Sequence, residues 1–340
     1  MFTTILSSVL VFGALIFFHE LGHFLVAKRV GIHVKEFAIG FGPKVVSWTS
    51  KETDYSLRIF PLGGFVRMTG EDPEEKDEPG SFHKQSVFNR FAVIASGPIM
   101  NFLLAITLFF LIYFAFMGVA ATPVQIGEVL ADGRAQEVGL QVGDTIVSIN
   151  GEGVESWEQV VRTINAHPGE EIVLGIERNN VVQEIPVTPE PDSETGRGLI
   201  GIGPKTVMYQ FVPSLLLGLE NTWMFLNFIF VSLLQMITGQ IPADVAGPVG
   251  IVQIVGEVAQ TGVINLLNLA AVLSINLGLI NLLPIPALDG SRLVFLLIEG
   301  VRGKPVDPNK ESFVHFVGFA LLILLMVFIA YRDILRLDIF

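Results

Sequence analysis

The sequence has no cysteine among its 340 residues, and only 16% of those residues are charged. Without cysteine there is no disulfide framework and no thiolate metal site, so any metal ion must be held by histidine and carboxylate side chains. Lysine and arginine number 21 against 33 aspartates and glutamates, and the resulting net charge of -12 excludes nucleic acid as an expected partner. Hydrophobic residues make up 51% of the chain and the mean hydropathy is +0.60, which is typical of a membrane protein.

Four apolar segments are long enough to cross the roughly 30 Å hydrocarbon core of a membrane. They cover approximately residues 3–26, 91–117, 264–283 with an irregular continuation to 299, and 313–331. No basic residues precede the first segment and no small-residue cleavage site follows it, so we interpret it as a retained transmembrane helix and not as a signal peptide. The sequence therefore predicts a polytopic α-helical membrane protein with about four transmembrane helices.

Basic residues divide the connecting segments into two kinds. Segment 27–90 carries ten lysines and arginines and segment 284–312 carries four, whereas segment 119–212 carries 14 acidic and five basic residues. By the positive-inside rule the two basic segments face the cytoplasm, so the N-terminus and the acidic segment face outward.

The apolar run 213–237 has two interpretations. It is long enough to span a membrane, but Glu220, Asn221, Asn227 and Gln235 interrupt it. A fifth span would also break the topology derived from the charges. We favour an amphipathic helix that lies in the interface or re-enters the membrane over a fifth span.

Three polar residues interrupt the first apolar segment at helical spacing. In the pattern His19-Glu20-x-x-His23 the two histidines lie on one helix face and can present their ring nitrogens to a single metal ion. Glu20 projects beside them as a candidate general base. The alternative is a set of polar groups hydrogen-bonded to neighbouring spans, but buried ionisable groups are costly and a zinc ion compensates that cost. Lys28 follows His23 by about 7 Å of helix rise, which predicts an ion nearer the cytoplasmic face.

The pattern leaves the metal short of a third protein ligand. Asp289 is the one carboxylate within residues 266–298. Two prolines just before it break the helix, so its side chain leaves from non-helical backbone. Asp289 could instead cap a helix that begins near Ser291. We favour ligation because the histidine pair lacks a partner.

Several short motifs follow one another along the chain. They are "HELGH" at 19–23, "GFGP" at 40–43, "PLGGFVRM" at 61–68, "GPIMN" at 97–101, "AGPVGI" at 246–251 and "LDG" at 288–290. Together they resemble the bacterial site-2 proteases, which are intramembrane zinc metalloproteases, and among them the PDZ-containing subgroup that degrades anti-sigma factors. The resemblance covers essentially the whole chain and implies a multi-pass protein of the bacterial inner (cytoplasmic) membrane.

The resemblance also implies roles for individual residues. His19, His23 and Asp289 would bind Zn2+, with Glu20 as the general base. Asn281 would hydrogen-bond the substrate or an intermediate, and Asn101 would support the site from the second span.

The outward segment is expected to be a small α+β domain. Strand-like runs alternate with two short helical ones between 119 and 205, with turns at Asn150-Gly151 and Asn179-Asn180. The resemblance implies an extracytoplasmic PDZ domain here. Some members of the family carry two such domains in tandem, and this chain has room for one. The domain either docks exposed C-termini or filters substrates by size, and we favour the filter.

Residues 44–68 predict a membrane-associated β-hairpin with a polar turn at 51–54. Its free edge could bind an unwound substrate as an added strand, with Gly63 and Gly64 allowing close approach of the two backbones. The alternative is an ordinary cytoplasmic hairpin that covers the site, in which these glycines form a bulge.

Four regions are therefore expected. Residues 1–118 form the first two transmembrane helices with the hairpin and the zinc motif, and 119–205 form the PDZ domain. Residues 206–262 form the amphipathic helix and a connecting segment, and 263–340 form the last two transmembrane helices with the third ligand.

The function we expect is zinc-dependent intramembrane endoproteolysis of single-span membrane proteins. The resemblance suggests anti-sigma factors after a first cut, and remnant signal peptides. A competing interpretation is a non-catalytic membrane scaffold with a structural metal and a peptide-binding PDZ domain. A metal transporter ranks last, because the spans carry few polar residues.

Overall fold

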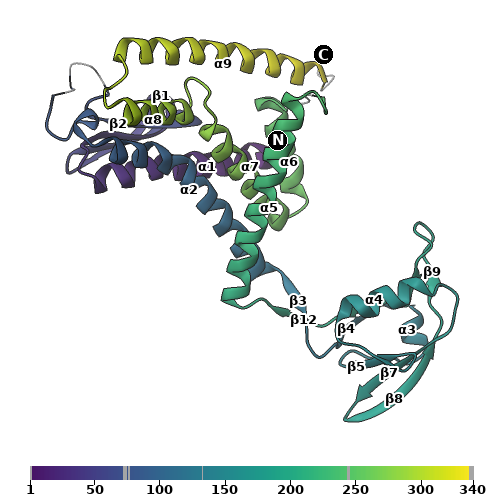
Figure 1. Ribbon diagram of the computed structural model, residues 1–340. Coiled ribbons are helices and arrows are strands. Elements are labelled where there is room, and N and C mark those ends of the chain that lie inside the picture. Colours follow the sequence, from purple (N-terminus) through teal and green to yellow (C-terminus); the bar gives the residue numbers. More distant parts are fainter. Residues whose placement is uncertain (1, 72–74, 76, 132, 243–245, 337–340) are drawn as a thin grey trace. The chain divides into compact units, whose positions relative to one another are not determined.

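The computed structural model describes residues 2–71, 75, 77–131, 133–242 and 246–336. Two compact units make up the chain (Figure 1). One unit, the helical unit, comprises Met1–Ile112 and Val212–Phe340, and the other, the β domain, comprises Tyr113–Phe211.

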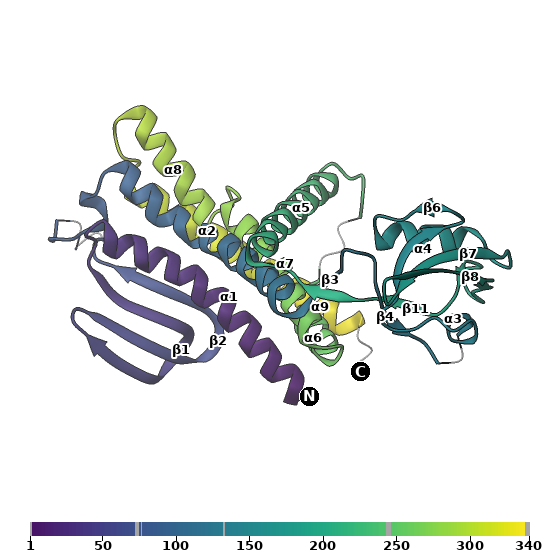
Figure 2. The same ribbon diagram turned by 90° about the horizontal axis from the view of Figure 1, so that it is seen from below.

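Three helices pack side by side at the centre of the helical unit (Figures 1 and 2). They are α1 (Phe2–Arg29), α2 (Val87–Leu111) and α7 (Val263–Leu282), and α2 continues as a π-helical turn to Phe116. Small residues let their backbones approach: a Cβ on Gly278 of α7 would lie 3.0 Å from the carbonyl oxygen of Pro98. Ser274 of α7 also donates a 2.7 Å hydrogen bond to the backbone oxygen of Asn101.

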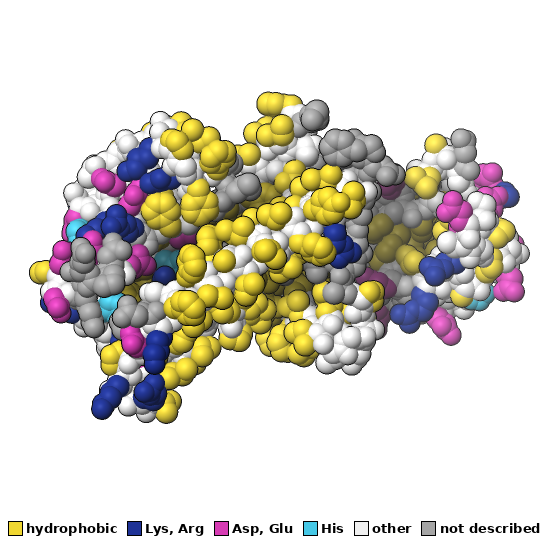
Figure 3. Space-filling view, turned by 90° about the horizontal axis from the view of Figure 1, so that it is seen from above, with side chains coloured by type: hydrophobic (Ala, Val, Ile, Leu, Met, Phe, Trp, Pro, Cys, Tyr) yellow, Lys and Arg dark blue, Asp and Glu magenta, His cyan; other side chains and the backbone are white. Residues whose placement is uncertain are grey.

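Five helices in the described part of the chain are long and apolar enough to cross a membrane: α1, α2, α5 (Phe211–Ile237), α7 and α9 (Pro308–Arg336). The sequence predicted about four, and α5 is the additional candidate. It is one continuous helix of 27 residues, with exposed apolar side chains such as Trp223 and Phe228. Figure 3 shows hydrophobic side chains spread over the helices, with charged ones gathered at one end of the helical unit. Such a surface suits a lipid environment.

The predicted hairpin is present and longer than expected. Strand β1 (Val34–Ser50) pairs antiparallel with β2 (Thr53–Met68), so β1 begins ten residues before the predicted start at residue 44. Gly40 and Gly42 would be expected to interrupt the strand. Their φ angles of +89° and +87° instead allow shifts in the pairing register, and β1 stays paired with β2 on both sides of them. The inner half packs against α1, with Phe37 between Phe17 and Phe24, and the outer half is exposed (Figure 2).

Two shorter helices complete the helical unit. Helix α6 (Pro248–Gln260) begins where Asp333 of α9 accepts hydrogen bonds from the amides of Gly247 (3.1 Å) and Gly250 (2.8 Å). Helix α8 (Asp289–Arg302) is held against α2 by Glu299, which binds the buried Arg90 guanidinium through two hydrogen bonds of 2.6 and 3.0 Å. Two-point pairing of this kind fixes both distance and orientation.

The β domain has its own core beneath a four-stranded sheet of order β6-β5-β7-β8. The sheet strands are β5 (Thr145–Ile149), β6 (Glu152–Gly153), β7 (Ile172–Arg178) and β8 (Val181–Val187), and the helices are α3 (Arg134–Glu137) and α4 (Trp157–Ala166). Smaller pairs are formed by β3 (Gly118–Ala120) with β12 (Thr206–Met208), β4 (Ile126–Val129) with β11 (Ile202–Pro204), and β9 (Glu190–Pro191) with β10 (Gly198–Leu199). Val160 and Ile164 of α4 pack on Ile146 and Leu174 of the sheet.

A buried ion pair makes the β domain sensitive to acid. Burial alone would raise the pKa of Asp144, but hydrogen bonds from the Arg178 guanidinium and the Gln141 amide outweigh it and hold that pKa below its usual range. The folded domain therefore binds this proton more weakly than the unfolded chain, whose carboxyl has a pKa near about 3.9. The stabilisation is complete above that value and is lost as pH falls below it.

We expect hydrogen exchange of β5 and β7 in the full-length protein to accelerate as pH is lowered below about 4, beyond the change in intrinsic rate. Asp144→Asn removes this part of the pH dependence. Equal pH dependence in the wild type and the variant would contradict the assignment.

Candidate metal centre

The centre forms where α1 crosses α2, and two glycines permit that crossing. A Cβ on Gly22 of α1 would overlap the backbone carbonyl of Ser96, and a Cβ on Gly97 of α2 would overlap Nε2 of His23 and lie 2.6 Å from its Cε1. Neither clash can be relieved by rotating a flexible side chain, because one partner is backbone and the other is a packed ring. The glycine in "HELGH" and the glycine in "GPIMN" therefore serve the same contact.

His19, His23 and Asp289 lie together, although about 270 residues separate the histidines from the aspartate. His19 Nε2 is 3.2 Å and His23 Nε2 is 3.4 Å from Asp289 Oδ2, and the two Nε2 atoms are 3.3 Å apart. The side chains are 12%, 9% and 18% exposed, respectively, so little water reaches them.

The donor set fits a zinc ion. Tetrahedral ligands about 2.0 to 2.1 Å from zinc lie about 3.3 to 3.4 Å from one another, close to the three distances measured here. Asp289 Oδ2 is buried and has no hydrogen-bond partner in the described part of the chain, which is costly for a carboxylate oxygen unless a cation is near. Two imidazoles and a carboxylate are also ligands that zinc prefers.

Groups behind the histidines orient their rings. His23 Nδ1 donates to the carbonyl oxygen of Val93 at 2.8 Å, so its Nε2 carries a lone pair that faces the centre. His19 Nδ1 lies 3.1 Å from Nδ2 of the fully buried Asn101, whose Oδ1 has no partner among the described residues. Rotating the amide by half a turn exchanges these two atoms and gives both a better role: Oδ1 then accepts the Nδ1 proton of His19 and leaves the Nε2 of His19 free in the same way. The predicted supporting residue from the second span thus contacts a predicted ligand.

Asp289 is the first residue of α8, directly after the proline-containing break. The prediction that its side chain leaves from non-helical backbone is therefore wrong, because the helix begins at Asp289 itself. The helix is preceded by Leu288, and no side chain caps it. The alternative role of Asp289 as a helix cap is therefore not what the structure shows. Its side chain turns toward the two histidines instead.

A cavity of about 600 Å³ opens onto the centre. Glu20 lines it beside the two histidines, and Gly64 to Met68 of β2 form another wall. A Cβ on Gly64 would lie 2.9 Å from Glu20 Cγ, so β2 passes directly over the glutamate. Phe316 and Phe319 of α9 add an apolar surface suited to side chains of a membrane protein.

Two predicted substrate-binding residues lie away from this cavity. Asn281 occupies the last turn of α7 and is not among the described residues that line it. Gly63 has a φ angle of +123°, and a Cβ there would overlap the ring of Phe41. Gly63 lies where the pairing register shifts between Ile39 and Phe41 of β1, so the bulge interpretation fits Gly63 and the close-approach interpretation fits Gly64.

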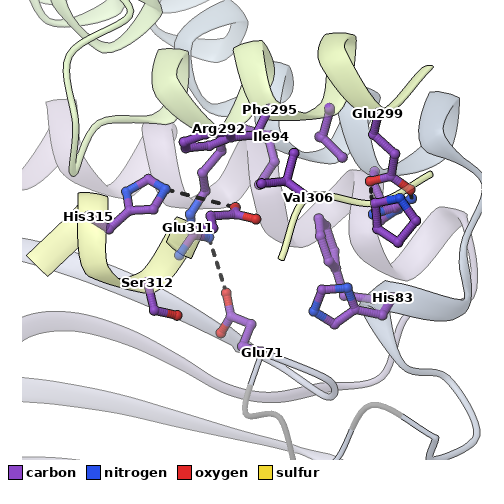
Figure 4. Close-up of a pocket in the computed structure, with 14 residues that line it drawn as sticks. Glu71, His83, Ile94, Arg292, Phe295, Glu299, Val306, Glu311, Ser312 and His315 are labelled. Carbon is purple, nitrogen blue, oxygen red and sulfur yellow. Dashed lines mark hydrogen bonds and ion pairs between the residues drawn. The ribbon is translucent and has the colours of Figure 1, made fainter. Parts of the chain in front are cut away.

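A second cavity of about 270 Å³ adjoins the first and shares Glu71, Ile94, Arg292 and His315 with it. In Figure 4, Arg292 reaches Glu71 across the cavity, and the ring of His315 faces Glu311. Gly22 and Gly97 lie within the "HELGH" and "GPIMN" motifs, but the sequence assigned no role to either glycine. Arg292 and His315 lie outside all of the quoted motifs, so no pattern in the sequence marks them.

A buried set of two histidines and one carboxylate, with a further glutamate in the same cavity and long apolar helices around it, defines a membrane-embedded metalloenzyme. Residues 7–325 match the model of peptidase family M50. The zinc metalloprotease RasP of Geobacillus kaustophilus is 41% identical, with 97% of each chain covered, and the regulator of sigma-W protease RasP of Bacillus subtilis is 37% identical, with 98% of this chain and 99% of the relative covered. The chain belongs to peptidase family M50, the site-2 proteases, and is a zinc-dependent metalloprotease of a bacterial membrane.

The relatives differ from one another in the length of the alignment. The alignment with the Geobacillus protein runs over 412 positions, 72 more than the 340 residues of this chain, so it includes gaps in this chain. A putative zinc metalloprotease of Clostridium acetobutylicum aligns over 335 positions at 39% identity, with 98% of each chain covered. Among solved structures, the PDZ domain of an SdrC-like protein from Listeria monocytogenes is 21% identical over 26% of this chain and 93% of that domain, with a TM-score of 0.23.

Proposed function

We propose that His19, His23 and Asp289 hold the catalytic zinc ion and that Glu20 is the general base. The observation that carries this assignment is the triangle of ligand atoms, with sides of 3.2 to 3.4 Å, in a buried site. When bound, zinc supplies Lewis-acid chemistry, which polarises a scissile carbonyl and lowers the pKa of water. Glu20 accepts the proton of the attacking water and later delivers a proton to the leaving amine.

Asn101 holds the His19 ring in the orientation that ligation requires. Gly64 gives the substrate backbone room beside Glu20, and this role is supported by its place in the wall of the cavity. For Gly63 and Asn281 the support is weaker, because neither lines the cavity among the described residues.

The substrate we propose is a single-span membrane protein whose helix unwinds at the cut. A helix conceals its carbonyl groups in its own hydrogen bonds, so the protease must supply other partners for that backbone. Strand β2 is paired on one side only, with β1, in the described sheet, and its segment from Phe65 to Met68 lines the cavity. An unwound substrate can add to this edge as a strand beside Glu20.

We further propose that the substrates are anti-sigma factors after a first extracytoplasmic cut. The name of the Bacillus subtilis relative, a regulator of sigma-W protease, supports this class. The distribution of basic residues supports an extracytoplasmic N-terminus and β domain. In that orientation the β domain, which we propose is PDZ-like, meets the part of a substrate that remains outside and excludes substrates that have not been trimmed.

The test is cleavage of a purified single-span substrate by the full-length protein in liposomes. We expect cleavage within the transmembrane segment, loss of cleavage with a zinc chelator and recovery when zinc is restored. A soluble unfolded protein added outside the liposomes is the control and stays intact. Cleavage that persists in chelator, or an intact membrane substrate under every condition, would contradict the proposal, and the second result would favour the scaffold.

A further inference from the structure

His315 of α9 contacts the loop that carries Asp289, yet it belongs to neither the ligand set nor the H-E-x-x-H motif. Its Nδ1 accepts a 3.2 Å hydrogen bond from the backbone amide of Ala287, two residues before Asp289. The ring of Phe295, on α8 beyond the aspartate, packs edge-on against the imidazole at 5.9 Å between centroids. His315 therefore touches the chain on both sides of Asp289.

The backbone held by this bond is strained. Ala287 has a φ angle of +76°, a left-handed conformation that a residue with a Cβ rarely adopts. Such a conformation persists when surrounding contacts hold it, and it is found where a site requires a particular direction of the chain. Here it turns the chain between the helix break and α8, which sets the direction in which Asp289 leaves the backbone.

Two further contacts fix α9 relative to this loop. A Cβ on Gly318, one turn after His315, would overlap Pro286 Cβ and lie 2.8 Å from its carbonyl carbon, so α9 packs directly on the loop at that glycine. Near its other end, α9 is fastened to α6 by Asp333. These contacts fix α9, so the position of the His315 imidazole does not depend on its hydrogen bond to the loop.

The hydrogen-bond role of each ring nitrogen follows from these contacts. Because Nδ1 accepts the Ala287 amide, the proton of the neutral ring sits on Nε2. Nε2 is buried and lies 3.9 Å from Glu311 Oε1, toward which the ring faces in Figure 4, and it has no hydrogen-bond partner among the described residues. Within the described part of the chain, the imidazole therefore makes a single hydrogen bond, the one to the loop.

We propose that His315 is a positioning residue for the third metal ligand: its Nδ1 holds the amide of Ala287 and thereby aims Asp289 at His19 and His23. This inference rests on the proposed role of Asp289 as a ligand. Groups that orient ligands contribute to metal affinity, and losing one typically costs about 10- to 100-fold.

Two variants, His315→Asn and His315→Gln, have side chains of the same polarity and distinguish loss of this hydrogen bond from a general loss of packing. In His315→Asn the amide oxygen takes the place of Nδ1 and can accept the Ala287 amide. In His315→Gln the amide group takes the place of Nε2, and the acceptor at the Nδ1 position is lost. Ser312→Ala on the same helix is the control for any change in α9, and Asp289→Ala is the control for the ligand itself.

The first measurement is the zinc dissociation constant of the full-length protein in a competing chelator. We expect His315→Gln to bind zinc about tenfold or more weakly than the wild type, with His315→Asn and Ser312→Ala close to the wild type. In cleavage assays at saturating zinc, His315→Gln should lower kcat more than it changes KM. The other residues that line the cavity are retained, whereas Asp289 is no longer aimed at the two histidines.

The second measurement is hydrogen exchange in the metal-free protein, over the peptide containing residues 283–288, which has few amides because two of its residues are proline. Ala287 should exchange faster in His315→Gln than in the wild type and in His315→Asn. Equal zinc affinity and equal exchange in the Asn and Gln variants would overturn the role of His315. That result is distinct from failure of the proposed ligand set, which would appear as undiminished zinc binding by Asp289→Ala.

Discussion

Glu20→Gln is expected to slow peptide-bond cleavage by about 100- to 10,000-fold while zinc binding is retained. Glutamine has the same size and shape as glutamate and fits the same wall of the cavity, but its amide cannot accept a proton from water. Glu20 lies outside the triangle of His19, His23 and Asp289, so no proposed ligand is lost.

The measurement is the initial rate of cleavage together with zinc content per chain. Glu257→Gln, an exposed exchange on α6, is the matched control and should behave as the wild type. If Glu20→Gln supported normal cleavage while loss of either histidine abolished it, Glu20 would have no catalytic role and another proton acceptor would have to be found.

Adding a single methyl group at Gly97 is expected to weaken zinc binding. Gly97→Ala places a Cβ against Nε2 of His23 and 3.0 Å from Cε1 of His19, and neither ring can move away, because α1 and α2 are in backbone contact at Gly22. The two nitrogen atoms are then displaced from the triangle. We expect zinc affinity to fall by at least about tenfold, the lower end of the effect seen when groups that orient metal ligands are lost, and cleavage to fall with it.

Gly13→Ala is the matched control for this change, because a Cβ there has no neighbour within 4 Å on the same membrane helix that carries the histidines. It should leave zinc affinity and cleavage unchanged. Wild-type zinc affinity in Gly97→Ala would show that the rings tolerate the added atom and that the close crossing has no part in the site.

The metal centre was largely predictable from the sequence, because burial makes its residues conspicuous. A histidine pair and a glutamate stand out in an apolar helix, and Asp289 is the one carboxylate within residues 266–298, in the third apolar segment. The structure brings these ligand atoms within 4.8 Å of one another. The helix break before Asp289 followed from its two prolines.

The packing around the centre was not predictable in the same way. Gly22 and Gly97 matter because of which atoms face them across a helix crossing, and one sequence does not contain that information. His315 contacts Ala287 from α9, 28 residues further along the chain, and nothing in the sequence indicates that these two residues meet. The early start of β1 was missed because glycines usually interrupt strands. Here Gly40 and Gly42 lie where the pairing register shifts, and the strand continues past both.

The interfacial or re-entrant placement of segment 213–237 stays a prediction, but one of the two reasons for it is weakened by the structure. Its polar residues argued against a span, but Asn221 and Asn227 donate to carbonyl groups of their own helix, 2.8 and 2.9 Å away, so α5 satisfies them internally. A polar side chain is thus compatible with a transmembrane helix when it donates a hydrogen bond to a carbonyl group in the preceding turn.

We propose Asp289 as the ligand that completes the zinc site with His19 and His23. The most direct measurement is zinc per chain by elemental analysis of the purified wild type, Asp289→Ala and Glu20→Gln after dialysis against a weak chelator. We expect about one zinc per chain in the wild type and in Glu20→Gln and a large loss in Asp289→Ala, because the ion is then left with two protein ligands. Full zinc content and undiminished cleavage in Asp289→Ala would contradict the account.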